Sequence, residues 1–226
     1  MRLAVKLGGS IALTDQGPSS EYAVGFRSAV QNIDPEKLVV GIGGGHLARN
    51  YLRSIGKMLS PEDSEKVVIQ LLRANTQFMA LVLGGFPIFE EQDLESVAAQ
   101  TGARVLVIGG IKPGRSTDAN TALLAEAVRA DLFVKMTDVE GVYTGDPDVD
   151  PETHLLREMS YDQAWAVSLD GKPGSYGVLD RLSLQVLKRA QIPVRVINGR
   201  DPQNLVKLIS GEEMGTLIGP RPSQKW

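Results

Sequence analysis

The chain has 226 residues, no cysteine and a formal net charge of −3 at pH 7. The lack of cysteine excludes disulfides, zinc–thiolate sites and a cysteine nucleophile, and a near-neutral chain without a basic run argues against a nucleic-acid partner. The sequence has no uncharged apolar stretch of 18 residues, and it enters an apolar run directly, without a basic-then-apolar leader. We therefore expect a cytoplasmic protein with no membrane partner.

Apolar runs alternate with segments of helical period along the chain. Runs without polar alternation indicate strands buried on both faces, at Leu3–Leu7, Lys37–Ile42, Arg104–Ile108, Asp131–Met136 and Val194–Ile197. Helical periodicity predicts helices at Glu21–Gln31, His46–Ile55, Asp63–Leu83, Asp93–Thr101, Thr117–Ala130, Val178–Ala190 and Pro202–Ile209. This order predicts an α/β fold, a doubly wound and mainly parallel central sheet with helices on both faces, an α/β/α sandwich.

Three of the predicted strands end in glycine-rich loops that open onto helices. The loops are Gly8–Ser10, Gly43–Gly45 and the longer Gly110–Thr117. A helix N-terminus after such a loop offers backbone N–H groups and a positive dipole end, which suit an anionic ligand. None of the three has the spacing of a P-loop or of a dinucleotide fingerprint. Because ligands of doubly wound sheets bind at the carboxyl ends of the strands, the loops predict a site for a ligand with several phosphates.

Four motifs, in this order along the chain, carry a family resemblance. They are Lys6-Leu-Gly-Gly-Ser10, Gly43-Gly-Gly-His-Leu-Ala-Arg49, Thr117-Asp-Ala119 and Thr137-Asp-Val-Glu-Gly-Val-Tyr-Thr-Gly-Asp-Pro147. Together they resemble the amino acid kinase superfamily, and among its members the archaeal-type uridylate kinases. The resemblance implies transfer of the γ-phosphoryl group of ATP to UMP, with Mg²⁺ carried by the nucleotide, no metal ligand supplied by the protein, and a homohexameric assembly. It also implies one amino acid kinase domain over residues 1–226, with an acceptor-binding lobe (about 1–130) and an ATP-binding lobe (about 131–226).

The resemblance implies three catalytic residues, Lys6, Asp118 and Asp180. Lys6 interrupts an apolar strand, so its ammonium needs a partner and is placed to meet the transferring phosphoryl group. The two carboxylates would orient cations, because a bare carboxylate facing phosphate would be repulsive. The alternative for Asp118 is compensation of a helix dipole, and for Asp180 an ordinary acid in the first helical turn. We expect Lys6→Ala and Asp118→Asn to lose turnover and keep the fold.

ATP contacts are expected on both sides of the chain's midpoint. Tyr143 would pack near adenine or ribose, and Lys135 would add a second cation near the phosphates. By resemblance the ATP-binding residues are Lys6, Gly8, Gly9, Ser10, Gly45, Arg49, Lys135, Thr137, Asp138, Tyr143 and Asp146.

UMP contacts are expected mainly from the loop before the helix at Thr117–Ala130. Glu65 stands where archaeal relatives usually carry aspartate, and would accept hydrogen bonds from ribose hydroxyls; Thr117 would also cap the helix. A side chain at Gly44 would meet the phosphate. Arg73 is left open between the UMP phosphate and a neighbouring subunit. By resemblance the UMP-binding residues are Gly44, Glu65, Ile111, Lys112, Pro113, Gly114, Arg115, Ser116 and Thr117.

Three other functions stay open at the level of sequence. The first is another phosphotransferase of the superfamily, such as isopentenyl phosphate kinase or acetylglutamate kinase. The second is a non-catalytic nucleotide-binding or oxyanion-binding protein on the same fold, against which the combination of Lys6, Asp118 and Asp180 argues. The third is a doubly wound domain with glycine turns and no nucleotide.

Overall fold

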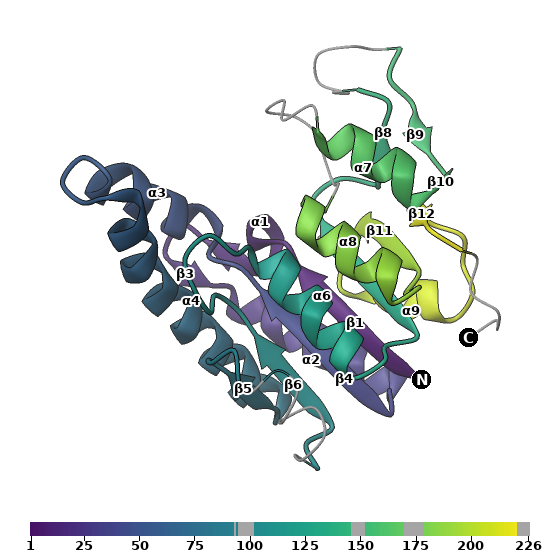
Figure 1. The fold of residues 1–226 in the computed structure, drawn as a ribbon. Coiled ribbons are helices and arrows are strands. Elements are labelled where there is room, and N and C mark those ends of the chain that lie inside the picture. The colour runs from purple at the N-terminus through teal and green to yellow at the C-terminus, as the bar shows by residue number, and fades with distance from the viewer. Residues whose placement is uncertain (93, 95–101, 146–151, 170–178, 221–226) are drawn as a thin grey trace.

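Helices cover both faces of one central sheet (Figure 1). The structure is a computed structural model that describes residues 1–92, 94, 102–145, 152–169 and 179–220. Among these residues, no helix combines the length and the apolar character needed to cross a membrane. The helix predicted at 93–101 lies, except for Leu94, outside the described residues.

The central sheet has eight strands in the order β10-β12-β11-β7-β1-β4-β6-β5. These strands are β1 (Arg2–Leu7), β4 (Lys37–Ile42), β5 (Phe86–Ile88), β6 (Val105–Ile108), β7 (Leu132–Thr137), β10 (Glu158–Met159), β11 (Val194–Asn198) and β12 (Thr216–Ile218). Every pair from β11 to β5 is parallel, and within the described part of the sheet only β11 and β12 pair antiparallel. The predicted mainly parallel sheet is confirmed.

The apolar runs form strands because both faces of the sheet are covered. Along β1, Leu3, Val5 and Leu7 enter one buried cluster, together with Phe26 on the helix side, whereas Ala4 enters the opposite cluster. Alternate residues of a strand point to opposite faces, so an all-apolar run serves two cores at once. Each of the five predicted strands is present, with ends that differ by one residue at most.

Two helical layers complete the sandwich (Figure 1). One face carries α2 (Ser20–Ile33), α4 (Pro61–Leu83) and α9 (Gln203–Ile209), which contribute Phe26, Met79 and Leu205 to the first cluster. The other face carries α6 (Thr117–Ala127), α7 (Tyr161–Leu169) and α8 (Arg181–Arg189). The predicted α/β/α layering is therefore present in the structure.

Several short elements of the structure were not predicted from the sequence. They are α1 (Gly9–Ala12), the pair β2 (Leu13–Thr14) and β3 (Gly17–Pro18), the pair β8 (Val142–Tyr143) and β9 (Leu155–Leu156), the edge strands β5 and β10, the short strand β12, and helix α7. Strands of two or three residues are too short to show a period, and α7 has only a weak apolar stripe. Helix α3 (Gly45–Ile55) was predicted to within one residue.

Candidate functional site

The loops after three neighbouring strands meet at the carboxyl edge of the sheet. The N–H of Gly8, after β1, donates to the carbonyl of Met136 at 2.8 Å, near the end of β7. A Cβ added to Gly9 would lie 2.5 Å from the Cα of Gly45, and one added to Gly43 would lie 3.5 Å from Oγ1 of Thr117. The glycine-rich loops predicted to bind phosphate therefore lie against one another.

Two lysines share one carboxylate at this edge. Lys6 and Lys135 are paired residues of the adjacent parallel strands β1 and β7. Asp118, in the first turn of α6, reaches Lys6 Nζ through Oδ1 at 2.8 Å and Lys135 Nζ through Oδ2 at 2.8 Å. The side chains of Lys6, Lys135 and Asp118 are 7%, 13% and 15% exposed. The structure thus brings Lys6 and Lys135, both predicted to bind ATP, into contact with Asp118, which was predicted to be catalytic.

The charges of this cluster stabilise one another. Burial alone would raise the pKa of Asp118, but the ammonium groups of Lys135 and Lys6 outweigh burial and hold that pKa well below its usual range. Asp118 is therefore a carboxylate at neutral pH, and the three residues carry one net positive charge. An excess cation at a largely buried site is suited to an anionic ligand.

Close packing explains two of the site glycines, and corrects the expectation for Gly44. Gly9 and Gly45 exclude side chains because their backbones touch, and Gly45 has a φ of 59°, which favours glycine. A Cβ on Gly44 would lie 2.3 Å from Cβ of Ala48 and 2.8 Å from Cδ1 of Leu72. The expectation that a side chain at Gly44 would meet the phosphate is thus wrong, because the side chain would first clash with Ala48 of α3 and Leu72 of α4.

The loop from Ile111 to Thr117, here called the acceptor loop, makes polar contacts with other parts of the chain at several residues. The N–H of Gly114 donates to Oε2 of Glu65, on α4, at 2.6 Å. Lys112 and Arg115 both bind Glu91. Glu65 was expected near this loop, and the structure brings the two together through a main-chain hydrogen bond.

Helix α6 starts at the predicted residue, but its N-cap differs from the prediction by one residue. Ser116, not Thr117, is the N-cap, because its Oγ accepts from the N–H of Ala119 at 2.9 Å. Thr117 is instead the first residue of the helix. The sequence Ser116-Thr117 offers two hydroxyls in a row, and the pattern alone did not separate them.

Asp180 was expected to orient cations, and among the described residues it binds two serines. It is the N-cap of α8, where Oδ1 accepts from the N–H of Ser183 at 3.1 Å and Oδ2 accepts from the Ser183 hydroxyl at 2.6 Å. Oδ2 also accepts from the hydroxyl of Ser116 at 2.5 Å. Asp180 therefore links α8 to the acceptor loop. Helix α8 begins at Arg181, and Val178, the predicted start of this helix, lies outside the described residues.

The remaining predicted ATP residues lie on several elements. Thr137 ends β7, and its hydroxyl donates to Oδ1 of Asp138 at 3.1 Å. Tyr143 lies in β8, paired with Leu155 of β9, and Arg49 is exposed on α3. Asp146 lies outside the described residues. The nucleotide contacts of these residues stay predictions.

Several residues of the site were missed by sequence analysis. Asn75, on α4, donates from Nδ2 to the carbonyl of Gly43 at 3.1 Å and so holds the second glycine loop. Arg73, which the sequence analysis did name, binds Glu90 at 2.8 Å and the carbonyl of Phe89 at 3.1 Å. Glu91 belongs to the same short segment. These residues lie far from their partners in sequence, and no local motif marks them.

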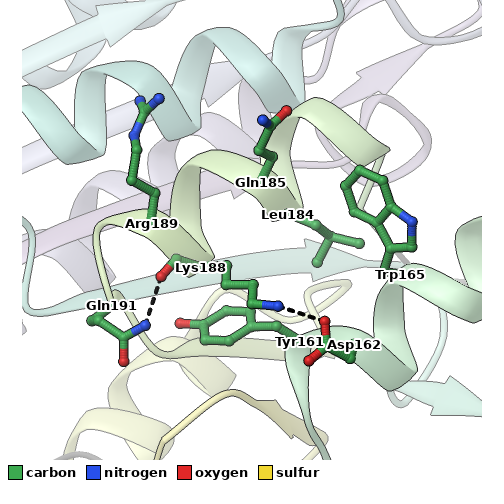
Figure 2. Close-up of a pocket in the computed structure, with 8 residues that line it drawn as sticks. All are labelled: Tyr161, Asp162, Trp165, Leu184, Gln185, Lys188, Arg189 and Gln191. Atoms are coloured by element: carbon green, nitrogen blue, oxygen red, sulfur yellow. Dashed lines mark hydrogen bonds and ion pairs between the residues drawn. The ribbon is translucent and has the colours of Figure 1, made fainter.

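One cavity lies away from this cluster. Its volume is about 580 Å³, and it lies between α7 and α8, lined by Tyr161, Asp162, Trp165, Leu184, Gln185, Lys188, Arg189 and Gln191 (Figure 2). None of these is a predicted site residue, and Lys188 is already paired with Asp162 at 2.5 Å. Within the described residues, no three acidic or histidine side chains gather as a metal site.

Comparison with known proteins identifies the family. Residues 1–198 match the amino acid kinase family. The chain belongs to the amino acid kinase family. It is 38% identical over 186 residues to a uridylate kinase of Hyperthermus butylicus, covering 80% of this chain and 82% of the relative. It is 36% identical over 227 residues to a uridylate kinase of Methanothrix thermoacetophila, covering 96% of this chain and 99% of the relative.

A solved structure agrees with this membership. The crystal structure of uridylate kinase from Archaeoglobus fulgidus superposes with a TM-score of 0.79 at 29% identity, over 96% of this chain and all of that chain. The resemblance inferred from four short motifs is thereby confirmed. This amino acid kinase chain therefore carries the family fold over almost its full length.

The buried cluster predicts the stability of an Asp118→Asn variant. The substitution removes the carboxylate charge that two largely buried ammonium groups share, and we expect it to lower the free energy of unfolding by about 3–5 kcal/mol at pH 7, measured by urea denaturation. This replaces the expectation of an unaffected fold. Asp162→Asn removes an exposed pair with Lys188 and should cost less than about 1 kcal/mol.

The same cluster predicts a pH dependence. Because the pKa of Asp118 is lower in the folded chain than in the unfolded chain, the unfolded chain binds a proton first as the pH falls. The stabilisation from Asp118 is complete above its unfolded pKa and is lost below about pH 5. Wild type should therefore lose more stability than Asp118→Asn between pH 7 and pH 3. Parallel losses in the two proteins would contradict the paired carboxylate.

Proposed function

We propose that this chain is a uridylate kinase, an ATP-dependent nucleoside monophosphate kinase that transfers the γ-phosphoryl group of ATP to UMP and releases UDP and ADP. Relatives that cover nearly the whole chain at up to 36% identity bear that name. The observation that carries the proposal is the buried cluster of Lys6, Asp118 and Lys135 beside the first turn of α6. Two cations fixed side by side suit a phosphoryl group in transfer.

Lys6 and Lys135 would stabilise the negative charge of the transferring phosphoryl group and would form no covalent bond to it. Phosphoryl transfer needs positioning and electrostatic stabilisation more than covalent help from the protein. Lys6 and Lys135 project from paired positions of adjacent strands, so their ammonium groups are presented to the same anion. Asp118 holds both in place and prevents their mutual repulsion from separating them. It is the positioning carboxylate for both lysines.

The acceptor side needs binding groups and no general base. The phosphate of UMP is already ionised at neutral pH, so its oxygen attacks without losing a proton to the protein. The first N–H groups of α6, at Thr117 and Asp118, have no partner within the helix and carry the positive end of its dipole. We propose that they and the Thr117 hydroxyl bind this phosphate. Glu65 has a second carboxylate oxygen for a ribose hydroxyl.

The remaining assignments extend the same proposal. ATP arrives with Mg²⁺ held mainly by phosphate oxygens and water, and the ion adds positive charge at the transferring group. We propose an acceptor-binding lobe over about residues 1–130 and an ATP-binding lobe over about residues 131–226. A homohexamer, a role in pyrimidine nucleotide biosynthesis and a cytoplasmic location stay predictions.

The rival phosphotransferases differ in their acceptor. An isoprenoid phosphate would need a long apolar pocket and a histidine that meets its phosphate. The two histidines of the chain do not suit this role: His46 is exposed beside Asp15 at 3.4 Å, and the N–H of His154 donates to Thr144, next to β9. A non-catalytic binding protein would not need two buried lysines held by one carboxylate.

A substrate panel tests the proposed acceptor. ADP release from ATP and Mg²⁺ is measured with UMP, CMP, dUMP, isopentenyl phosphate and acetylglutamate. We expect kcat/KM to be highest for UMP, because the acceptor loop and Glu65 are arranged for a nucleoside monophosphate. A preference for isopentenyl phosphate or acetylglutamate would overturn the acceptor and keep the ATP site, and ATP binding without any turnover would favour a storage role.

Lysine variants test the proposed chemistry. Lys6→Met and Lys135→Met keep the length of each side chain and remove its charge. Each should lower kcat by about 100-fold or more, as loss of one electrostatic donor to a transition state does. Lys188→Met removes a lysine of the α7–α8 cavity and should leave kcat within about twofold. If either cluster variant retained wild-type kcat with UMP, that lysine would not act on the phosphoryl group.

A further inference from the structure

The segment that follows β5 binds two arginines that come from different elements. Glu90 pairs with Arg73 of α4 at 2.8 Å, and Arg73 also lies over the ring of Phe89, with Cζ 5.9 Å from its centroid. Glu91, the next residue, pairs with Arg115 of the acceptor loop at 2.6 Å. Two consecutive carboxylates thus bind similar partners, but only Glu91 contacts the acceptor loop.

Glu91 binds the acceptor loop at two points. Lys112 Nζ lies 2.9 Å from its Oε1 and 2.7 Å from its Oε2, and Arg115 Nη1 lies 2.6 Å from Oε1. Lys112 and Arg115 stand on either side of Pro113 and Gly114, at the turn of the loop, where Gly114 has a φ of 76°. One carboxylate therefore clamps both sides of this turn.

The guanidinium of Arg115 depends on this carboxylate. The Arg115 side chain is only 7% exposed, and within the described residues its Nε and Nη2 are buried without a hydrogen-bond partner. A buried cation without a counter-charge is costly, so the charge of Glu91 is what allows Arg115 to stay buried. Hydrogen bonds from Lys112 and Arg115 lower the pKa of Glu91, which keeps it ionised at neutral pH.

The opposite side of the turn is held by a different group. Glu65 accepts from the N–H of Gly114, and Asp180 accepts from the hydroxyl of Ser116. These two hydrogen bonds link the loop to α4 and α8, while Glu91 links it to the segment after β5. Of the three, only the Glu91 contact neutralises charges of the loop itself, so its loss changes both the position and the net charge of the loop.

We propose that Glu91 is a positioning residue for the acceptor, which fixes the acceptor loop in its binding shape through Lys112 and Arg115. The proposal rests on the proposed function for its kinetic consequence, because the loop is assigned to the acceptor nucleotide. Glu91 itself does not touch the reacting atoms. Its loss should therefore weaken binding of the acceptor and leave the phosphoryl-transfer step and the ATP site largely intact.

The kinetic test compares Glu91→Gln with Glu90→Gln. Both variants remove one carboxylate charge paired with an arginine of the same region. Glu91→Gln should raise KM for UMP by about tenfold, as expected for loss of a charge-assisted contact, with kcat and KM for ATP within about twofold of wild type. Glu90→Gln should change none of the three by more than about twofold. Equal behaviour of the two variants, or a loss confined to kcat, would overturn the proposal.

A second measurement does not depend on activity. Amide hydrogen exchange at residues 111–117 should speed up about tenfold or more in Glu91→Gln and stay at the wild-type rate in Glu90→Gln. Exchange at the loop could speed up in Glu91→Gln although the wild type does not accept UMP as a substrate. In that case Glu91 still positions the loop, and the proposed function is wrong instead. Unchanged exchange overturns the role of Glu91 whatever the substrate is.

A conservative variant distinguishes local release of the acceptor loop from global unfolding. Glu91→Asp keeps the charge and shortens the side chain by one methylene, so it can hold one cation of the loop but not both at the present distances. It should give loop exchange and a KM for UMP between those of wild type and Glu91→Gln. An Asp variant as impaired as the Gln variant, with both losing the far-ultraviolet circular dichroism of the wild type, would assign Glu91 to folding and overturn the proposal.

Discussion

The carboxylate of Asp118 between the ammonium groups of Lys6 and Lys135 is the interaction on which the site depends. Two lysines on adjacent buried strands repel each other and are costly to desolvate, and the shared carboxylate offsets both costs. The two lysines and Asp118 together carry one net positive charge. The same ion pairs also connect the sheet to α6, because Asp118 lies in the first turn of this helix, directly after the acceptor loop.

The fold makes this arrangement from elements that lie far apart in the chain. Parallel pairing of β1 with β7 sets Lys6 opposite Lys135, although 129 positions separate them in sequence. Helix α6 then lies against β1 and β4 and brings Asp118 over that pair. The acceptor loop is held around this centre by three carboxylates, Glu65, Glu91 and Asp180, each from a different part of the chain. The residues that hold the acceptor loop thus come from several parts of the chain, whereas the two lysines that we propose to face the ligand lie side by side.

Much of this was predictable because it follows from local pattern. Unbroken apolar runs indicate strands covered on both faces, and glycine-rich strand ends mark the carboxyl edge as the site, where Lys6 and Asp118 indeed meet. The missed features depend on contacts between distant residues. Glu91 and Asn75 carry no motif, Asp180 binds serines because α8 starts at its side chain, and the reason for Gly44 is the packing of Leu72. The charge of a residue and the periodicity of apolar residues can be read from the sequence, whereas contacts between side chains that are distant in sequence cannot.

The central claim is that Lys6 and Lys135 jointly face the transferring phosphoryl group. The most direct measurement is a crystal structure of the chain with UMP, Mg²⁺ and an ATP analogue that cannot be hydrolysed. We expect γ-phosphate oxygens within hydrogen-bond distance of both lysine Nζ atoms, with Asp118 still bonded to both lysines and the UMP phosphate at the start of α6. A γ-phosphate that contacts neither lysine, or an analogue bound in the cavity between α7 and α8, would contradict it.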